Sequence, residues 1–237
     1  MLDFWTRAPI VFWSVVFFVF GTVVGSFLNV CIHRMPLDLS LAKPGSQCPK
    51  CGFAIPWRLN IPIVSWLWLR GRCRQCAASI SPRYLGVELL TGLAFLASWL
   101  AFGEQNTPGV LLAVTWGFVL AGLITATFID FEHFIIPDQI TLGGVAVGFI
   151  VSAGLPALHH VTRPPDSLMA SGLGILVGAG SVFAVLQLGK LLFGKVRVPL
   201  EEGESATFTE SALHLPGEVA PFEEIFFRNS DTIRLHA

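Results

Sequence analysis

The amino-acid sequence predicts an all-α polytopic membrane protein with about five transmembrane helices and a small cysteine-rich loop between the first two. Three observations lead to this prediction: few charged residues, repeated long apolar runs, and four cysteines in one polar segment. Of the 237 residues, 53% are hydrophobic and 13% are charged, whereas soluble domains average about 25% charged residues. The mean hydropathy is +0.68. The net charge of −1 and the lack of a nucleic-acid-binding motif give no reason to expect a nucleic-acid partner.

The predicted transmembrane helices correspond to five apolar runs, each close to the roughly 20 residues that cross a bilayer core. They cover residues 10–30, 84–102, 110–129, 140–155 and 168–193. The fourth run is short and rich in glycine. The first run could instead be a signal peptide, but only one basic residue precedes it and no small-x-small cleavage site follows. A retained helix is therefore the better interpretation.

The distribution of basic residues predicts how the helices are oriented in the membrane. Residues 33–83 contain eight basic residues and a single acidic residue, Asp38. Short loops rich in Lys and Arg stay in the cytoplasm, so this loop should be cytoplasmic. Alternation of the five helices then puts the N-terminus outside, and puts Asp130 and Lys190 on the cytoplasmic side.

The chain divides into four predicted parts. These are a first transmembrane helix (1–32), a cytoplasmic four-cysteine loop (33–83), a four-helix transmembrane body (84–194) and an acidic cytoplasmic tail (195–237). Within the tail, residues 221–235 contain enough apolar side chains to form a small pair of strands or helices.

The four loop cysteines are spaced like the ligands of a zinc ribbon. Cys48 and Cys51 form one C-x-x-C pair, and Cys73 and Cys76 form the second. Each pair can supply two thiolates to a tetrahedral Zn²⁺, and four thiolates leave no open position for substrate, which indicates a structural site. The alternative is four reduced cysteines without metal, because a disulfide framework is not expected in the cytoplasm. Cys31, at the end of the first apolar run, is interpreted as a packed small apolar residue.

An acidic segment, TFIDFEHFIIPDQIT, follows the third apolar run. Asp130 falls at the predicted membrane boundary, where an ionisable group is costly unless it faces a polar cavity or a partner. The alternative is a loop acid that faces water. The apolar residues around it favour a short, partly buried hairpin. Pro137 should end any helix there, and Asp138 should start and cap the next one. Glu132 and His133 are interpreted as facing water.

Asp130 alone cannot catalyse aspartic proteolysis. That reaction needs two carboxyl groups beside one water molecule, one ionised to accept the proton of the water and one protonated to donate to the peptide carbonyl. A second acid at another helix end is therefore required.

Three segments together resemble the type IV prepilin peptidases of bacterial inner membranes. These are GSFLNVCIHRMP, the paired C-x-x-C loop followed by SPRYLGVELLTG, and FIDFEHFIIPDQIT, which cover roughly residues 20–145 in the family's order. The resemblance implies a membrane aspartic endopeptidase that removes the leader of type IV prepilins or type II secretion pseudopilins at the cytoplasmic face. It also implies N-methylation of the new N-terminus with S-adenosylmethionine.

The resemblance further assigns individual residues. Asp130 begins the family's D-x6-P-D motif, which Pro137 and Asp138 complete, and Asp130 is thereby the expected catalytic residue. Cys48, Cys51, Cys73 and Cys76 match the zinc-binding loop that is associated with the methylation role. Glu88, in RYLGVELLTG, matches a recurring acidic position, and its role is left open.

The sequence departs from the family at the second catalytic motif, G-x-G-D-x-K, which does not occur. In the nearest similar segment, SGLGILVGAG, Ile175 stands in the place of the aspartate. The acidic residues after 200 resemble an insertion that some members carry before the second motif. The expectation is a fragment that does not cleave prepilins by itself. Asp231 lacks the flanking glycines and is not assigned as a catalyst.

Two other functions remain as alternatives. A non-catalytic zinc-ribbon scaffold of a pilus or secretion assembly would explain the missing second motif. A metal transporter that uses Asp130 and His133 is less favoured, because His159 and His160 fall on the opposite membrane face.

Overall fold

The computed structural model describes residues 10–103, 106–193 and 205–222, and it divides into two compact units, Met1–Ala179 and Gly180–Ala237. The helices of the first unit are α2 (Ile10–Arg34), α3 (Val64–Trp68), α4 (Pro82–Phe102), α5 (Thr107–His133) and α6 (Asp138–Gly154). Short 3-10 turns are η1 (Met35–Leu37), η2 (Trp57–Leu59) and η3 (Pro156–His159). Helix α7 (Pro164–Phe193) crosses the boundary between the two units.

The five predicted apolar runs all form helices, which confirms the predicted fold class. Within the described residues, four helices are long and apolar enough to cross a membrane, and α6, with 17 residues, is shorter. One boundary differs in an informative way: α5 continues to His133, four residues beyond the predicted end at 129. Asp130 therefore lies in the last helical turn and not in a loop.

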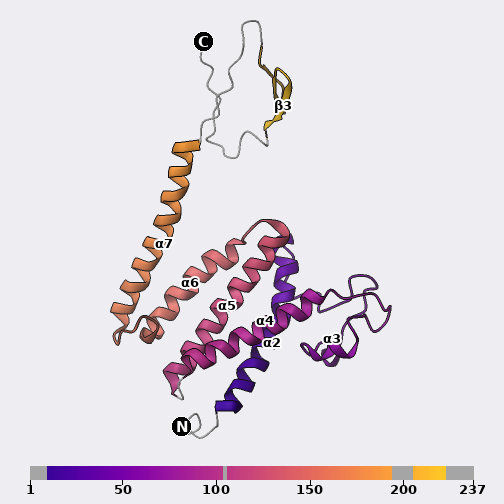
Figure 1. Ribbon diagram of the computed structural model, residues 1–237, viewed down its shortest axis with the longest axis vertical. Coiled ribbons are helices and arrows are strands. Elements are labelled where there is room, and N and C mark those ends of the chain that lie inside the picture. The colour runs from indigo at the N-terminus through magenta and orange to yellow at the C-terminus, as the bar shows by residue number, and fades with distance from the viewer. Residues whose placement is uncertain (1–9, 104–105, 194–204, 223–237) are drawn as a thin grey trace. The chain divides into compact units, whose positions relative to one another are not determined.

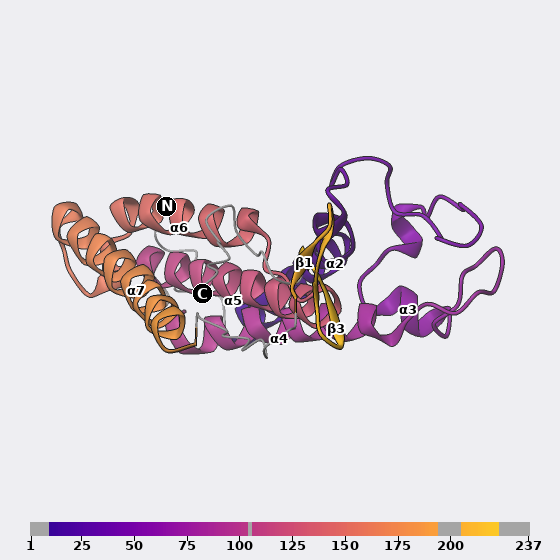
Figure 2. The same cartoon turned by 90° about the horizontal axis from the view of Figure 1, so that it is seen from above.

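The core of the first unit is formed by α2, α4 and α5 (Figure 1). Its buried side chains are Trp13, Phe17, Leu28, Ile32, Val87, Phe95, Trp99, Ala113, Ala121 and Ile129. Phe17 of α2 stacks on Trp99 of α4 with ring centroids 4.9 Å apart. Figure 2 shows the same helices from above, with the segment that carries α3 extending from their ends.

Glycines let α2 and α4 approach until their backbones touch. A Cβ atom added at Gly21 would lie 2.9 Å from the Cα of Gly92, and one added at Gly25 would lie 2.8 Å from the Cα of Glu88. Gly21 and Gly25 form a G-x-x-x-G pair, the spacing that allows membrane helices to pack closely. Close packing here brings the buried polar residues of α4 against α2.

The start of α4 is specified locally. Ser81 is the N-cap and accepts a hydrogen bond from the Arg83 backbone N–H at 3.2 Å, and Pro82 occupies the first helical position. Both residue types are favoured at these positions because they use or remove the free N–H groups of the first turn. The helix therefore begins directly after the cysteine-rich loop.

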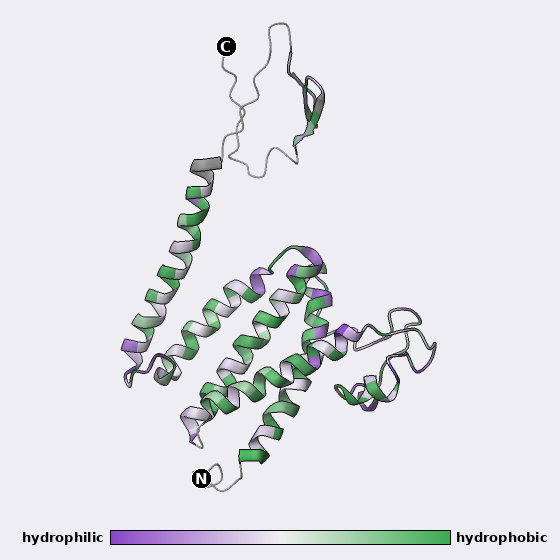
Figure 3. Ribbon diagram, viewed as in Figure 1, coloured by the Kyte–Doolittle hydropathy of each residue, from purple (hydrophilic) through white to green (hydrophobic). Residues whose placement is uncertain are grey.

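The outer surface of the helices is apolar. Leu142, Val147 and Ile150 of α6 are each at least 60% exposed, as expected for side chains that face lipid tails. Figure 3 shows the hydrophobic colours along the helices, with hydrophilic residues gathered where α5 meets α6 and in the segment that carries α3. We call the end of the bundle where α2 ends, α4 begins and α5 meets α6 the loop end.

The second unit contains a small antiparallel sheet in the order β1 (Thr207–Phe208), β2 (Ala212–Leu215), β3 (Glu218–Pro221). Gly217 turns the chain between β2 and β3 with a φ of 86°, a value that glycine adopts without strain. The prediction for residues 221–235 falls almost entirely outside the described residues.

Candidate functional site

The four loop cysteines converge on one point. Their Sγ atoms all lie within 4.8 Å of one another. The Sγ atoms of Cys48 and Cys76 are 3.8 Å apart, and those of Cys51 and Cys73 are 3.9 Å apart. Four sulfur atoms at about 2.3 Å from a tetrahedral Zn²⁺ are separated by about 3.8 Å. The cluster could hold a metal ion, and both its donor set and its dimensions fit zinc.

Two similar turns present the cysteines. In the first, the Cys48 N–H donates to the Phe53 carbonyl and the Gly52 N–H donates to the Cys48 carbonyl, both at 2.9 Å. In the second, the Ala77 N–H donates to the Cys73 carbonyl at 3.0 Å. Gly52 and Ala77 occupy equivalent positions, with φ values of 68° and 54°. The C-x-x-C sequences therefore fold as paired knuckles with the same backbone geometry.

The thiols differ in their affinity for protons. Backbone N–H groups of Cys51 and Lys50 point at the Cys48 sulfur and lower its pKa to about 6. The Phe53 N–H lowers the pKa of Cys51, but burial and the neighbouring thiols outweigh it and raise that pKa to about 12. The backbone N–H groups around Cys48 therefore favour its thiolate form. A bound cation would favour the thiolate of Cys51 as well.

A buried carboxyl group fastens the loop to the helices. Glu88, which is 8% exposed on α4, accepts a hydrogen bond at its Oε2 from the Ile63 backbone N–H at 2.7 Å. Ile63 has φ 64° and ψ −55°, and the Val64 N–H donates to the Pro62 carbonyl at 2.6 Å. This is a γ-turn, a strained conformation for a β-branched residue. Glu88 stabilises that turn, a structural role that the sequence left open.

Two further contacts join the helices at the loop end. The Asn29 side-chain amide of α2 donates to the Tyr84 carbonyl of α4 at 3.1 Å. Arg83 of α4 forms an ion pair with Glu132 of α5. Glu132 faces water as interpreted, with its side chain 39% exposed, but its carboxylate also binds a cation from the neighbouring helix.

Asp130 lies two residues before Glu132, in the last turn of α5, and its side chain is exposed. Its backbone carbonyl accepts from the Phe134 N–H at 2.8 Å and closes the helix. The structure gives its carboxylate no ion-pair partner among the described residues. An exposed acid at a helix end is free to meet a reacting group, whereas Glu132 beside it is already paired.

The segment after α5 differs from the prediction in two respects. Phe131 and Phe134 are 75% and 87% exposed, so the predicted partly buried hairpin is wrong, because apolar side chains at the end of a membrane bundle need no cover from the chain itself. Pro137 is the N-cap of α6, and no side chain among the described residues caps this helix. Asp138 therefore begins α6, as predicted, but does not cap it.

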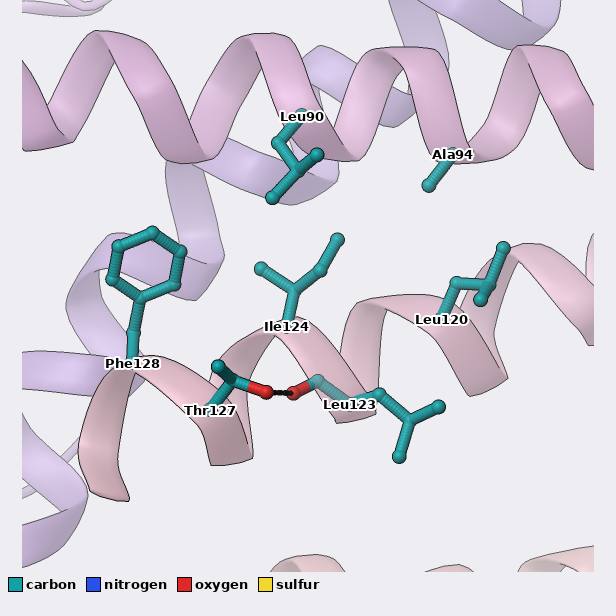
Figure 4. Close-up of a pocket in the computed structure, with 7 residues that line it drawn as sticks. All are labelled: Leu90, Ala94, Leu120, Leu123, Ile124, Thr127 and Phe128. Atoms are coloured by element: carbon teal, nitrogen blue, oxygen red, sulfur yellow. Dashed lines mark hydrogen bonds between the residues drawn. The ribbon is translucent and has the colours of Figure 1, made fainter. Parts of the chain in front are cut away.

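An apolar groove runs between α4 and α5 (Figure 4). It is lined by Leu90, Ala94, Leu120, Leu123, Ile124, Thr127 and Phe128. Its one polar side chain, Thr127, donates to the Leu123 carbonyl at 2.8 Å and so has no free hydrogen. The groove can receive apolar chains but supplies no catalytic group.

The sequence predicted the cysteine cluster and a helix that ends near Asp130. It did not predict the two contacts that join the loop and the helices in this region. Glu88 and Ile63 are 25 residues apart, and Arg83 and Glu132 are 49 apart. Only one signal was available: Arg83 directly precedes the predicted helix 84–102 and Glu132 closely follows the predicted helix 110–129, so antiparallel packing brings these ends together.

The fold and the site define a polytopic helical membrane protein that has a four-cysteine loop and an exposed acid at the same end of its bundle. The chain matches the bacterial peptidase A24 N-terminal domain over residues 19–102 and the type IV leader peptidase family over residues 117–197. It belongs to the type IV leader peptidase family.

Individual relatives agree with this assignment. A prepilin leader peptidase/N-methyltransferase of Myxococcus xanthus is 39% identical over 198 residues, which are 76% of this chain and 56% of the relative. A type 4 prepilin-like proteins leader peptide-processing enzyme of Escherichia coli is 38% identical, over 74% of this chain and 67% of the relative. A prepilin leader peptidase/N-methyltransferase of Dichelobacter nodosus is 35% identical, over 76% of this chain and 68% of the relative.

The aligned part of the chain thus spans between about half and two thirds of the length of these relatives. The search of solved structures gave no significant match.

Proposed function

We propose that this chain contributes to a membrane aspartic endopeptidase that removes the leader of type IV prepilins or type II secretion pseudopilins. The observation that carries the proposal is the position of Asp130, an exposed acid in the last turn of α5 within a chain of the type IV leader peptidase family. The names of the relatives support the substrate class.

Asp130 serves as one of the two carboxyl groups of the reaction. One carboxylate removes a proton from water as the water attacks the peptide carbonyl, and the other carboxyl group donates a proton to the carbonyl oxygen. Pro137 and Asp138 support this role indirectly. They set the end of the linker after α5 and the start of α6, and thereby limit where Asp130 can lie.

We assign none of the described residues of this chain as the second carboxyl group. The motif G-x-G-D-x-K is absent from the printed sequence, and Ile175 occupies the nearest similar position. We therefore expect the printed chain to need a segment that carries this motif before it cleaves prepilins. A non-catalytic scaffold remains the competing function, favoured by the same missing motif.

The four cysteines hold a structural Zn²⁺ in this proposal. Bound by four thiolates, the metal has no open coordination position, so it fixes the loop and takes no part in proteolysis. Methylation of the new N-terminus would use S-adenosylmethionine as methyl donor. We assign no residue of this chain to that cofactor.

The proposed location is the bacterial inner membrane, with the cysteine loop and Asp130 on the cytoplasmic side. The eight basic residues of 33–83 support this orientation. Because Arg83 and Glu132 join α4 to α5 at the loop end, Asp130 and the loop share one face of the membrane. Leaders that have not crossed the membrane would meet both.

The proposal is tested by reconstitution in liposomes. A protein that joins this chain to a segment with the G-x-G-D-x-K motif, and so carries both aspartate motifs, should shorten a synthetic prepilin. It should also transfer labelled methyl groups from S-adenosylmethionine to the product. The printed chain should do neither quickly. Efficient cleavage by the printed chain would show that the second carboxyl group is within it, and no cleavage by either protein would favour the scaffold.

A further inference from the structure

The short helix α3 turns its apolar face away from the protein. Val64, Leu67 and Trp68 are 54%, 57% and 70% exposed. Their spacing of i, i+3 and i+4 places all three on one side of the helix. Three large apolar side chains exposed on one face form a candidate interaction surface. We call these three residues the α3 face.

The opposite side of α3 is fixed to the loop. Ser65 is buried, and its Oγ accepts a hydrogen bond from the Ile61 N–H at 2.9 Å. The Trp66 indole donates to the Ile80 carbonyl at 3.4 Å, and a Cβ atom added at Gly71 would lie 2.7 Å from the Trp66 ring. Because Ser65 and Trp66 fix the inner side of α3 to the loop, rotating α3 about its axis to bury the apolar face would break these contacts.

The contact between Glu88 and Ile63 places α3 at the depth of the membrane surface. Glu88 is six residues into α4, or about 9 Å along the helix axis. Its side chain leans back toward the helix start, and α3 begins immediately after Ile63. The polar headgroup layer on each side of a bilayer is about 5–8 Å thick. A segment bonded to the second turn of a transmembrane helix therefore lies within or beside that layer.

The charge of the loop indicates which kind of surface covers the α3 face. Residues 33–83 have eight basic residues and one acidic residue, a formal charge of +7. Four thiolates around Zn²⁺ would contribute −2 and leave +5. Arg70 is exposed and follows Trp68 by two residues, so a cation lies close in the chain to the α3 face. This combination complements anionic lipid headgroups over apolar tails and repels a basic peptide.

We propose that α3 is an interfacial anchor, in which Val64, Leu67 and Trp68 insert among the headgroups of the anionic leaflet in which the chain itself resides. Trp68 is suited to this layer, because tryptophan concentrates at membrane–water interfaces. The anchor would hold the cysteine loop flat against the membrane. The inference is independent of peptidase activity.

The test measures tryptophan fluorescence of the full chain in lipid nanodiscs. Phosphatidylglycerol brominated near the headgroup end of its acyl chains quenches only indoles at that depth, whereas acrylamide quenches indoles in water. The contribution of Trp68 is the difference between the chain and its Trp68→Phe variant. Trp99→Phe is the matched control, because Trp99 is 1% exposed inside the bundle.

We expect brominated lipid to remove more than about half of the Trp68 emission, and acrylamide to remove little of it. Trp68 emission that is insensitive to brominated lipid and readily quenched by acrylamide would overturn the proposal. Protection of Trp68 that appears only after a prepilin is added would also overturn it, in favour of a protein partner.

A second arm tests the lipid charge. Each basic residue near an anionic surface favours binding roughly five-fold, so Arg70→Gln should lower the ratio of inserted to free α3 by about that factor. Replacing phosphatidylglycerol with phosphatidylcholine should lower the ratio of inserted to free α3 further. Equal quenching in both lipids would contradict the anionic headgroup as the partner.

Discussion

The Glu88 carboxyl group holds the backbone N–H of Ile63 at 2.7 Å and thereby joins the cysteine loop to the second turn of α4. Ile63 is the centre of a γ-turn that an isoleucine adopts only under strain. The same region of α4 lies against Gly25 of α2. Glu88 thus lies where the loop, α4 and α2 meet, so replacing it should change contacts in all three.

Replacing Glu88 with alanine should loosen the loop without unfolding the bundle. The change leaves the Ile63 N–H without its acceptor, which costs about 1–3 kcal/mol when the group stays buried. Amide hydrogen exchange at residues 61–66 should accelerate by about ten-fold or more, while α5 keeps its protection.

Glu88→Gln is the matched control, because its amide oxygen can still accept the hydrogen bond, and it should exchange more slowly than Glu88→Ala. Equal exchange in the alanine variant and the unchanged chain would show that this contact does not hold the loop.

The glycine contacts between α2 and α4 predict a strong position dependence. At Gly25 an added Cβ would meet the backbone of Glu88 at 2.8 Å, so the helices must move apart. Gly25→Ala should destabilise the bundle by about 1–3 kcal/mol in reversible unfolding from detergent micelles. At Gly122 on α5, an added Cβ would have no atom of the described residues within 4 Å beyond its own helix backbone and chain neighbours. Gly122→Ala should therefore be neutral or slightly stabilising, and a similar loss at both positions would argue against close helix packing.

The ion pair between Arg83 and Glu132 should contribute little to stability. Their side chains are 22% and 39% exposed, and pairs of this kind are worth about 0.2–1 kcal/mol. A double-mutant cycle with Arg83→Gln and Glu132→Gln should give a coupling energy in that range. A coupling above about 2 kcal/mol would contradict the exposure of the pair to water.

Removal of the metal should affect the loop alone. We expect one zinc ion per chain, released by a strong chelator, with faster proteolysis between residues 45 and 80 and unchanged helix content. Cys73→Ser should have the same effect, because it removes one of the four sulfur ligands.

Cys31→Ala is the control for this experiment. Cys31 is buried in α2 and is not part of the cluster, so its replacement should leave the zinc content at one. A chain that contains no zinc and keeps an ordered loop would contradict the proposed metal site.

Local sequence signals predicted most of the fold. The lengths of the apolar runs predicted the helices, because a membrane-spanning segment is recognisable from its own residues. The two C-x-x-C pairs predicted the cysteine cluster, because each pair needs only a short turn. The cap predicted at Asp138 failed by one position, since Pro137 already occupies the N-cap of α6.

Contacts between distant residues could not be predicted in the same way. The link from Glu88 to Ile63 depends on a strained turn that no propensity favours. The partner of Glu132 depends on which helices are neighbours. The apolar run predicts that α5 ends at residue 129, but the acidic residues that follow form a further helical turn, which apolar run length does not detect.

The most direct measurement is the rate at which a prepilin is cleaved by Asp130→Asn in the protein that carries both aspartate motifs, reconstituted in liposomes. Asparagine keeps the size of the side chain but cannot accept or supply the catalytic proton, so the rate should fall by at least about 100-fold. Asp138→Asn, with its side chain at the start of α6, should stay within about ten-fold of the unchanged protein. Cleavage by Asp130→Asn at a rate near that of the unchanged protein would contradict the catalytic role of Asp130.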